Sequence, residues 1–261
     1  MKNYRFMFIF DAKLCNPNGD VETGGPRIMP SGRCMVTKQC LAYKLKSYWN
    51  ACGIKVLHYT PNGESIQEKL GKQAEYIQKA LEYIDVRLFG ACDLAGKMIL
   101  KIKGAVTFEH AMSVDNVNEI MLTINRGYNV AVDENGKNIG SGYANLQQIL
   151  EYGLFTTYGG TNVFAAYDNG LSDDDMDIFF DGLCHVFEND AAAVRPVGSM
   201  NARKLIIWSW EGKKQPISDR ELKQSVIISR KDNLNVVTDF DEYVIAIKDT
   251  MPGVETKIID I

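Results

Sequence analysis

Hydrophobic and polar residues follow one another along this chain with spacings that predict both strands and helices. Aromatic and β-branched residues fill residues 4–12, YRFMFIFDA, a run typical of a strand. In residues 36–53 the apolar positions recur every three or four residues, which predicts a helix that begins after Thr37 and ends at Gly53. A second, charged helix is predicted over residues 65–83.

The second half of the chain continues this alternation of strands and helices. Residues 98–114 and 119–133 have the composition of strands, and the polar sequence ENGKN that follows predicts a turn that folds the second strand back as a hairpin. Residues 172–190 predict a helix with Ser172 as its N-cap, acids in its first turn and an apolar stripe. Three closing strands are predicted at residues 203–211, 224–230 and 242–249.

The order of these elements predicts an α+β fold. Strand, helix, strands, helix and strand is the order of a ferredoxin-like βαββαβ unit. We predict a single domain over residues 1–261, in which residues 55–84 form a helical insertion and residues 115–152 a hairpin insertion. Many functions use such a fold, so the order of elements alone does not identify one.

Composition indicates a globular protein with an ample core. The chain has 261 residues, of which 46% are hydrophobic and 24% charged. No apolar run approaches the roughly 20 residues of a membrane span, and the start of the chain turns polar too early for a signal peptide. We therefore expect a cytoplasmic protein with no membrane partner. The six cysteines form no C-x-x-C pair and show no zinc-type spacing with histidine, so we expect reduced thiols, no metal and no cofactor.

Charge is distributed unevenly along the chain. The net charge of −4 argues against a protein that simply coats nucleic acid. However, residues 1–50 carry eight Lys and Arg against three acids, whereas residues 151–200 carry one Arg against nine acids. Two interpretations remain open: one face binds a polyanion while the other meets a second subunit, or both are solvated faces without a binding role.

Short motifs occur along the chain in a fixed order. They are FDAKLCNPNGD (10–20), GGPRI (24–28), CMVTKQCLAYKLKSYW (34–49), DVRLFGA (85–91), GAVTFEHAMSVD (104–115), YGLF (152–155), LSDDDMDIFFDGLCHVFENDAAAVR (171–195) and RKLIIWSWE (203–211). The ordered set resembles the CRISPR-associated backbone subunits of Cascade, the Cas-seven family of the RAMP superfamily, and most closely its type I-C branch. The segment between Asp115 and Tyr152, where that family carries its thumb, is shorter here.

The resemblance implies a fold, a function and a set of partners. The fold would be a modified RNA-recognition-motif core with a thumb, and the protein a non-catalytic subunit of an antiviral ribonucleoprotein. It would polymerise head to tail along a CRISPR RNA and present that RNA to target DNA, with other Cascade subunits and a helicase-nuclease as further partners. The acidic residues 168–190 are then expected to meet the basic face of a neighbouring copy.

Guide RNA must be held by phosphate and sugar so that its base edges stay free for pairing. The stretch from Cys15 to Cys34 holds four Gly and three Pro between the first strand and the first helix. Its glycines let a phosphate approach the main chain, Asn can reach a 2′-hydroxyl, and Lys and Arg supply charge. Expected RNA contacts are Asn16, Asn18, Arg27, Arg33, Thr37 and Lys38, together with Lys44, which stands where relatives carry a basic cluster. The alternative is a solvated connector.

Three further residues are candidate RNA contacts. Arg126 and Tyr128 lie on the predicted hairpin, where a cation and an aromatic ring suit backbone binding and base stacking, although a plain surface hairpin fits them almost as well. Arg195 stands alone in the acidic stretch, either as an RNA contact or as the partner of an internal ion pair.

Two other classes of function remain open. Related type III subunits cut RNA with an aspartate in the loop after the first strand, so Asp20 is the candidate for catalysis, through a metal or a positioned 2′-hydroxyl. Asp20 could equally brace its Gly-rich turn with hydrogen bonds. A protein-interaction module that binds no RNA is the other alternative.

Overall fold

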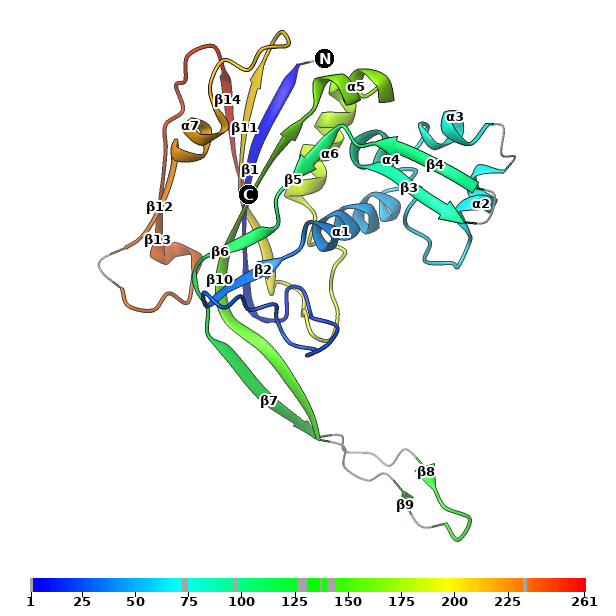
Figure 1. Ribbon diagram of the computed structural model, residues 1–261. Coiled ribbons are helices and arrows are strands. Elements are labelled where there is room, and N and C mark those ends of the chain that lie inside the picture. The colour runs from blue at the N-terminus through cyan, green and yellow to red at the C-terminus, as the bar shows by residue number, and fades with distance from the viewer. Residues whose placement is uncertain are drawn as a thin grey trace.

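The computed structural model has one large sheet, helices packed on it and a long arm that projects from one end (Figure 1). It describes residues 2–71, 75–95, 98–125, 131–136, 138–139, 144–231 and 234–261. The sheet runs in the order β14 (Glu255–Asp260), β11 (Met200–Trp210), β1 (Asn3–Cys15), β10 (Ala144–Thr161), β6 (Ala111–Asn116) and β2 (Arg33–Val36). Its pairings are antiparallel, and β5 (Val106–Phe108) and β7 (Glu119–Asn125) also pair with β10. The predicted α+β class is confirmed.

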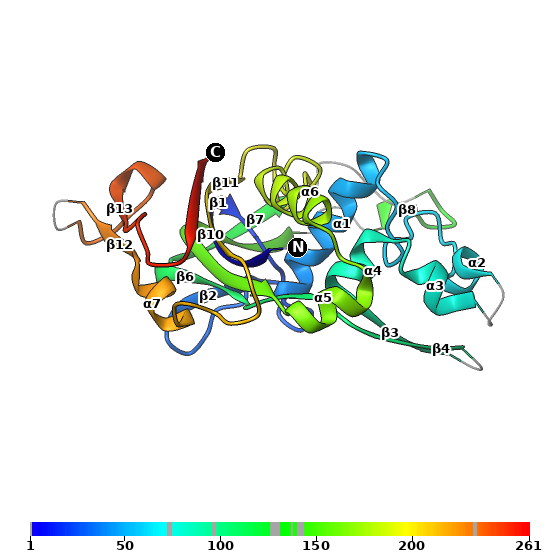
Figure 2. The ribbon, with the colours of Figure 1, turned by 90° about the horizontal axis from the view of Figure 1, so that it is seen from above.

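Both faces of this sheet are covered, which explains the apolar run in β1 (Figure 2). Alternate side chains of a strand point to opposite faces. Phe6, Phe8 and Phe10 are fully buried in the cluster under α1 (Lys38–Ala51) and α6 (Asp173–Cys184). Met7 and Ile9 lie in the cluster on the opposite face, which α7 (Asp219–Gln224), β12 (Val226–Arg230) and β13 (Tyr243–Ile247) complete.

Two helices begin at the residues that the sequence predicts. The Thr37 hydroxyl accepts a hydrogen bond from the Cys40 N–H at 3.2 Å, which caps α1. The Ser172 hydroxyl accepts from the Asp175 N–H at 3.1 Å, and the Asp175 carboxylate accepts in return from the Ser172 N–H, forming a capping box. The second helix ends at Cys184, earlier than residue 190, where the sequence places its end.

Other predicted elements are wrong in their extent. In place of one helix over 65–83, the structure has α2 (Ile66–Leu70), α3 (Tyr76–Ala80) and α4 (Ile84–Phe89). Gly71, with φ of 74°, ends α2, because a glycine adopts this conformation without strain. The predicted strand 98–114 is divided into β4 (Met98–Lys103), β5 and β6, since β4 pairs with β3 (Gly90–Ala95) rather than with the large sheet. The prediction missed β10, α5 (Val163–Asn169), α7 and β14.

The short helices and the β3–β4 hairpin have a hydrophobic cluster of their own. Leu57, Leu70, Tyr76, Ala80 and Leu100 are its most buried members. Beside this cluster, a histidine joins the hairpin to the segment before α2. His58 Nδ1 lies 3.1 Å from Asp85 Oδ2, and its Nε2 lies 2.8 Å from Asp93 Oδ2 on β3.

This histidine makes the stability of the hairpin dependent on pH. Burial opposes the charged ring, but the hydrogen bonds and charges of Asp85 and Asp93 outweigh it and raise the pKa of His58. A raised pKa stabilises the fold below about pH 6.5, the unfolded value, and this stabilisation is lost as pH rises through the folded value. In urea unfolding, His58→Gln should therefore lose more stability at about pH 5.5 than at pH 9. An equal loss at both pH values would contradict this role.

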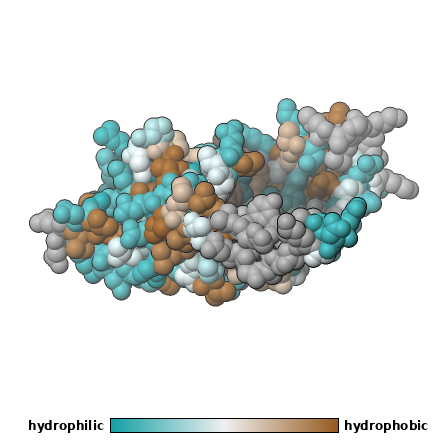
Figure 3. Space-filling model, turned by 90° about the horizontal axis from the view of Figure 1, so that it is seen from below, coloured by the Kyte–Doolittle hydropathy of each residue, from teal (hydrophilic) through white to brown (hydrophobic). Residues whose placement is uncertain are grey.

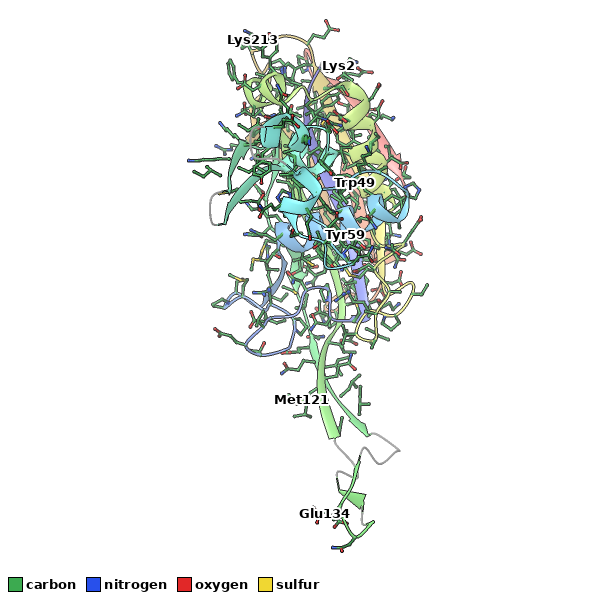
Figure 4. The ribbon with its side chains drawn as sticks, turned by 90° about the vertical axis from the view of Figure 1, so that its right-hand side faces the viewer. Lys2, Trp49, Tyr59, Met121, Glu134 and Lys213 are labelled. Atoms are coloured by element: carbon green, nitrogen blue, oxygen red, sulfur yellow. The ribbon has the colours of Figure 1, made fainter. Side chains whose placement is uncertain are left out.

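The arm is a two-stranded ribbon that continues from the sheet (Figures 1 and 4). β7 pairs with the first part of β10, and nearer the tip β8 (Ala131–Val132) pairs with β9 (Asn138–Ile139). The hairpin prediction is thus confirmed for the described residues. Met121 and Leu146 are 60% and 66% exposed, and hydrophobic patches also appear at the end that bears the arm (Figure 3). Among the described helices, none is long and apolar enough to cross a membrane.

Candidate nucleic-acid interface

The loop between β1 and β2 is braced by the side chain of Asp20. Its Oδ1 accepts from the backbone N–H groups of Glu22 and Thr23 at 2.9 and 3.3 Å. Its Oδ2 accepts from the Arg27 guanidinium at 2.8 Å. The two backbone donors lower the pKa of Asp20. This is the bracing arrangement that the sequence left open as the alternative to catalysis, and it also engages the charge of Arg27.

The two asparagines of the loop also make internal hydrogen bonds. Asn16 is 3% exposed, and its Nδ2 donates to the Gly24 carbonyl at 3.0 Å. Asn18 Oδ1 accepts from the Thr37 N–H at 2.8 Å, which attaches the loop to the start of α1. Thr37 itself caps that helix. These three predicted contacts therefore shape the loop, and the Asn16 side chain lies inside the protein.

Behind the loop, Asp190 binds two of the predicted RNA contacts. Lys44 is 3% exposed, and its Nζ pairs with Asp190 Oδ2. The same oxygen accepts from Arg195 Nε at 3.0 Å, and Arg195 extends a further nitrogen to within 3.5 Å of the Asn16 carbonyl. Burial lowers the pKa of Lys44. Of the two interpretations of Arg195, the structure shows the internal ion pair.

The acidic region divides into internal and exposed members. Asp175 is 6% exposed and pairs with the Arg87 guanidinium through both oxygens, at 2.6 and 2.9 Å. With Asp190, it neutralises cations of the fold itself. The acids of α6 and the following turn that remain exposed are Asp174, Asp177, Asp181 and Glu188.

Two of the predicted contacts remain accessible. Arg33 on β2 and Lys38 at the start of α1 are exposed, and neither forms an ion pair with any residue that the structure describes. Their segments adjoin the same strand: Arg33 lies opposite Asn116 on β6, and the Lys38 N–H donates to His110 Nδ1 at 3.0 Å, just before β6. They therefore lie on one side of the molecule, beside the loop.

Two lysines on β4 extend this side and were missed in the sequence. Lys101 and Lys103 are exposed, and neither has an ion-pair partner among the described residues. They alternate with the buried Leu100 and half-buried Ile102, so both point away from the hairpin's core. This alternation in MILKIK was the signal that could have identified them. β2, β6, β3 and β4 lie along one long side of the molecule (Figure 2), and we call Arg33, Lys38, Lys101 and Lys103 the basic strip.

The remaining candidates concern the arm and metal binding. Arg126 and Tyr128 lie outside the described residues. Within the described part of the chain, no group of three or more His, Cys, Asp or Glu is placed to hold a metal ion. All six cysteines are free, and burial raises the pKa of Cys34 to about 12.

Fold and interface together define an α+β protein with a Gly-rich loop beside exposed cations. The family model described as "CRISPR-associated protein Cas7" matches residues 2–248, and the chain belongs to this family. This is the Cas-seven family that the motifs resemble.

Comparisons of structure point to the same kind of assembly. The chain is similar to a chain of a "CRISPR RNA-guided surveillance complex, pre-nicking", with 14% identity, a TM-score of 0.54 and coverage of 84% of this chain and 81% of that one. It is also similar to a chain of a "CRISPR RNA-guided surveillance complex", with 19% identity, a TM-score of 0.49 and coverage of 88% and 78%. A search of curated proteins found no significant match.

Proposed function

We propose that this protein is an RNA-binding backbone subunit of a type I Cascade surveillance complex. The observation that carries the proposal is the exposed, unpaired pair of cations Arg33 and Lys38 beside a preorganised Gly-rich loop, in a chain of the Cas7 family. Cations at this position bind phosphates without reading base edges. The bases of the guide then remain available for pairing with target DNA.

Assembly along the RNA multiplies these contacts. Each copy contributes a few weak phosphate interactions, and many copies on one RNA give tight binding through multivalency. The arm serves as the thumb that reaches a neighbouring copy, and its exposed Met121 and Leu146 provide an apolar contact surface. The exposed acids of α6 face a basic surface of another subunit. Further partners are the other Cascade subunits and the helicase-nuclease.

The core is a modified RNA-recognition motif of the type I-C branch. The central strands β11, β1, β10 and β6 are neighbours in that order, and α1 and α6 pack in the cluster on one of their faces, which supports this assignment. Residues 55–84 and 115–152 are the insertions into this core.

The subunit holds RNA without cutting it. Because the Asp20 carboxylate already accepts hydrogen bonds from Glu22, Thr23 and Arg27, its role is to shape the loop. We expect purified protein to leave bound RNA intact in magnesium, and Asp20→Asn to produce no change in RNA length on a denaturing gel. Cleavage by the wild type that Asp20→Asn abolishes would instead establish the type III-like nuclease.

The test of the proposed function is expression with and without a cognate CRISPR array. Size-exclusion chromatography with absorbance at nucleic-acid and protein wavelengths should show a large assembly with RNA of guide length only when the array is present. A monomer free of RNA under both conditions would overturn the proposal and favour the protein-interaction module.

A further inference from the structure

A small hollow opens between the first helix and strand β5, within the basic strip. It has a volume of about 230 Å³. Gln39 and Ala42 of α1 form one wall, and Phe89, Thr107 and Phe108 form the other. The rings of Phe89 and Phe108 meet edge to face, with centroids 6.0 Å apart. The floor of the hollow is therefore aromatic and rigid.

Polar groups surround this apolar floor. The side chains of Lys38, Gln39 and Thr107 are exposed at its edge, and none of the three has a hydrogen-bond partner among the described residues. Lys38 stands on one side of the hollow. On the other side the wall strand follows Lys103 by three residues, so cations of the strip flank the opening.

Size and charge together select the occupant. A volume of 230 Å³ is below the roughly 300–1,000 Å³ of pockets for larger ligands, so the hollow accommodates a single ring system. Bases stack on aromatic side chains at sites where cations hold the adjoining phosphates. An exposed amide such as that of Gln39 can also hydrogen-bond the edge of a base. A strand of nucleic acid meets all three requirements.

We propose that this hollow binds one unpaired nucleobase of the RNA that follows the basic strip, with the adjoining phosphate on Lys38. The inference rests on the proposed RNA-binding function and adds a base site to it, away from the arm. A base held here is withdrawn from pairing, so the site sets the position of the guide strand on the subunit as well as its affinity.

Filling the hollow tests the proposal. Ala42→Leu adds apolar volume at its wall, in a helix that accepts leucine readily. The matched control is Ala51→Leu, the same exchange on the same helix, nine residues away and thus on its opposite side. The probes are oligouridylate and an abasic ribose-phosphate oligomer of equal length.

The wild type should bind oligouridylate about tenfold more tightly than the abasic oligomer, a difference that stacking of one base supplies. Ala42→Leu should remove this difference and leave the salt dependence of binding unchanged, because the phosphate contacts persist. Ala51→Leu should bind both probes as the wild type does, and both variants should unfold at the wild-type temperature.

Two results would overturn the inference. One is an Ala42→Leu protein that still prefers oligouridylate, and the other is a variant that keeps this preference but loses a protein partner of the complex. If the wild type binds neither probe, the proposed function itself fails. The failure of the base site and the failure of the RNA-binding function are therefore distinguishable.

Discussion

Replacing Asp190 with alanine is expected to lower the free energy of unfolding by about 3–5 kcal/mol. The Asp190 carboxylate is the ion-pair partner of both Lys44 and Arg195. Without it, the ammonium of Lys44, in a residue only 3% exposed, would remain buried beside a second cation. Leaving a buried charge without its partner costs far more than losing a surface ion pair. Urea unfolding followed by circular dichroism measures the change.

A control and a second variant separate this effect from general damage to the acidic region. Asp174→Ala removes an exposed acid of the same region and should change stability by less than about 0.5 kcal/mol. Adding Lys44→Met to Asp190→Ala removes the buried cation and should recover more than half of the loss, since Arg195 is partly exposed and can reach water. A double variant as unstable as Asp190→Ala alone would show that the pair is not the cause.

Replacing both Arg33 and Lys38 with glutamine is expected to weaken RNA binding by roughly tenfold or more, to a similar extent for every sequence. Each cation that leaves a single strand should reduce the slope of log K against log salt by about 0.7. Both side chains are exposed and unpaired among the described residues, so the variant should fold normally. Fluorescence anisotropy over a range of salt concentrations measures both quantities.

The charge-matched control for this variant is Lys213→Gln. Lys213 is exposed and lies at the end of the molecule opposite the arm (Figure 4). Its removal should leave the salt slope unchanged. If Lys213→Gln and the double variant weaken binding equally, RNA is held by the overall charge of the protein and not at the basic strip.

The local parts of the fold were predictable because their causes are local. The N-caps at Thr37 and Ser172 depend on hydroxyls and N–H groups three residues apart. In contrast, β10 was missed although it is the longest strand in the described chain, with 18 residues. It includes Gly159, where a side chain would approach Phe108 and Phe6 within 2.6 Å, so its composition reflects neighbouring strands that local propensity does not contain.

The candidate interface divides in the same way. The motifs and the basic N-terminal region identified the loop and the accessible cations Arg33 and Lys38. The same reasoning placed Lys44 and Arg195 with them, because a count of charges does not show which cations are already neutralised. Their partner Asp190 is 146 residues from Lys44 along the chain, and only folding brings the two together.

The sequence by itself determined the α+β class, the buried first strand, the capped helices and the membership of the Cas7 family. These follow from periodicity, local hydrogen bonds and ordered motifs, which are properties of neighbouring residues. Only the tertiary structure decided which polar groups face solvent, how β4 extends the basic strip and where α1 and β5 leave a hollow. Those features depend on packing between distant segments, and packing decides which charges stay free to meet a ligand.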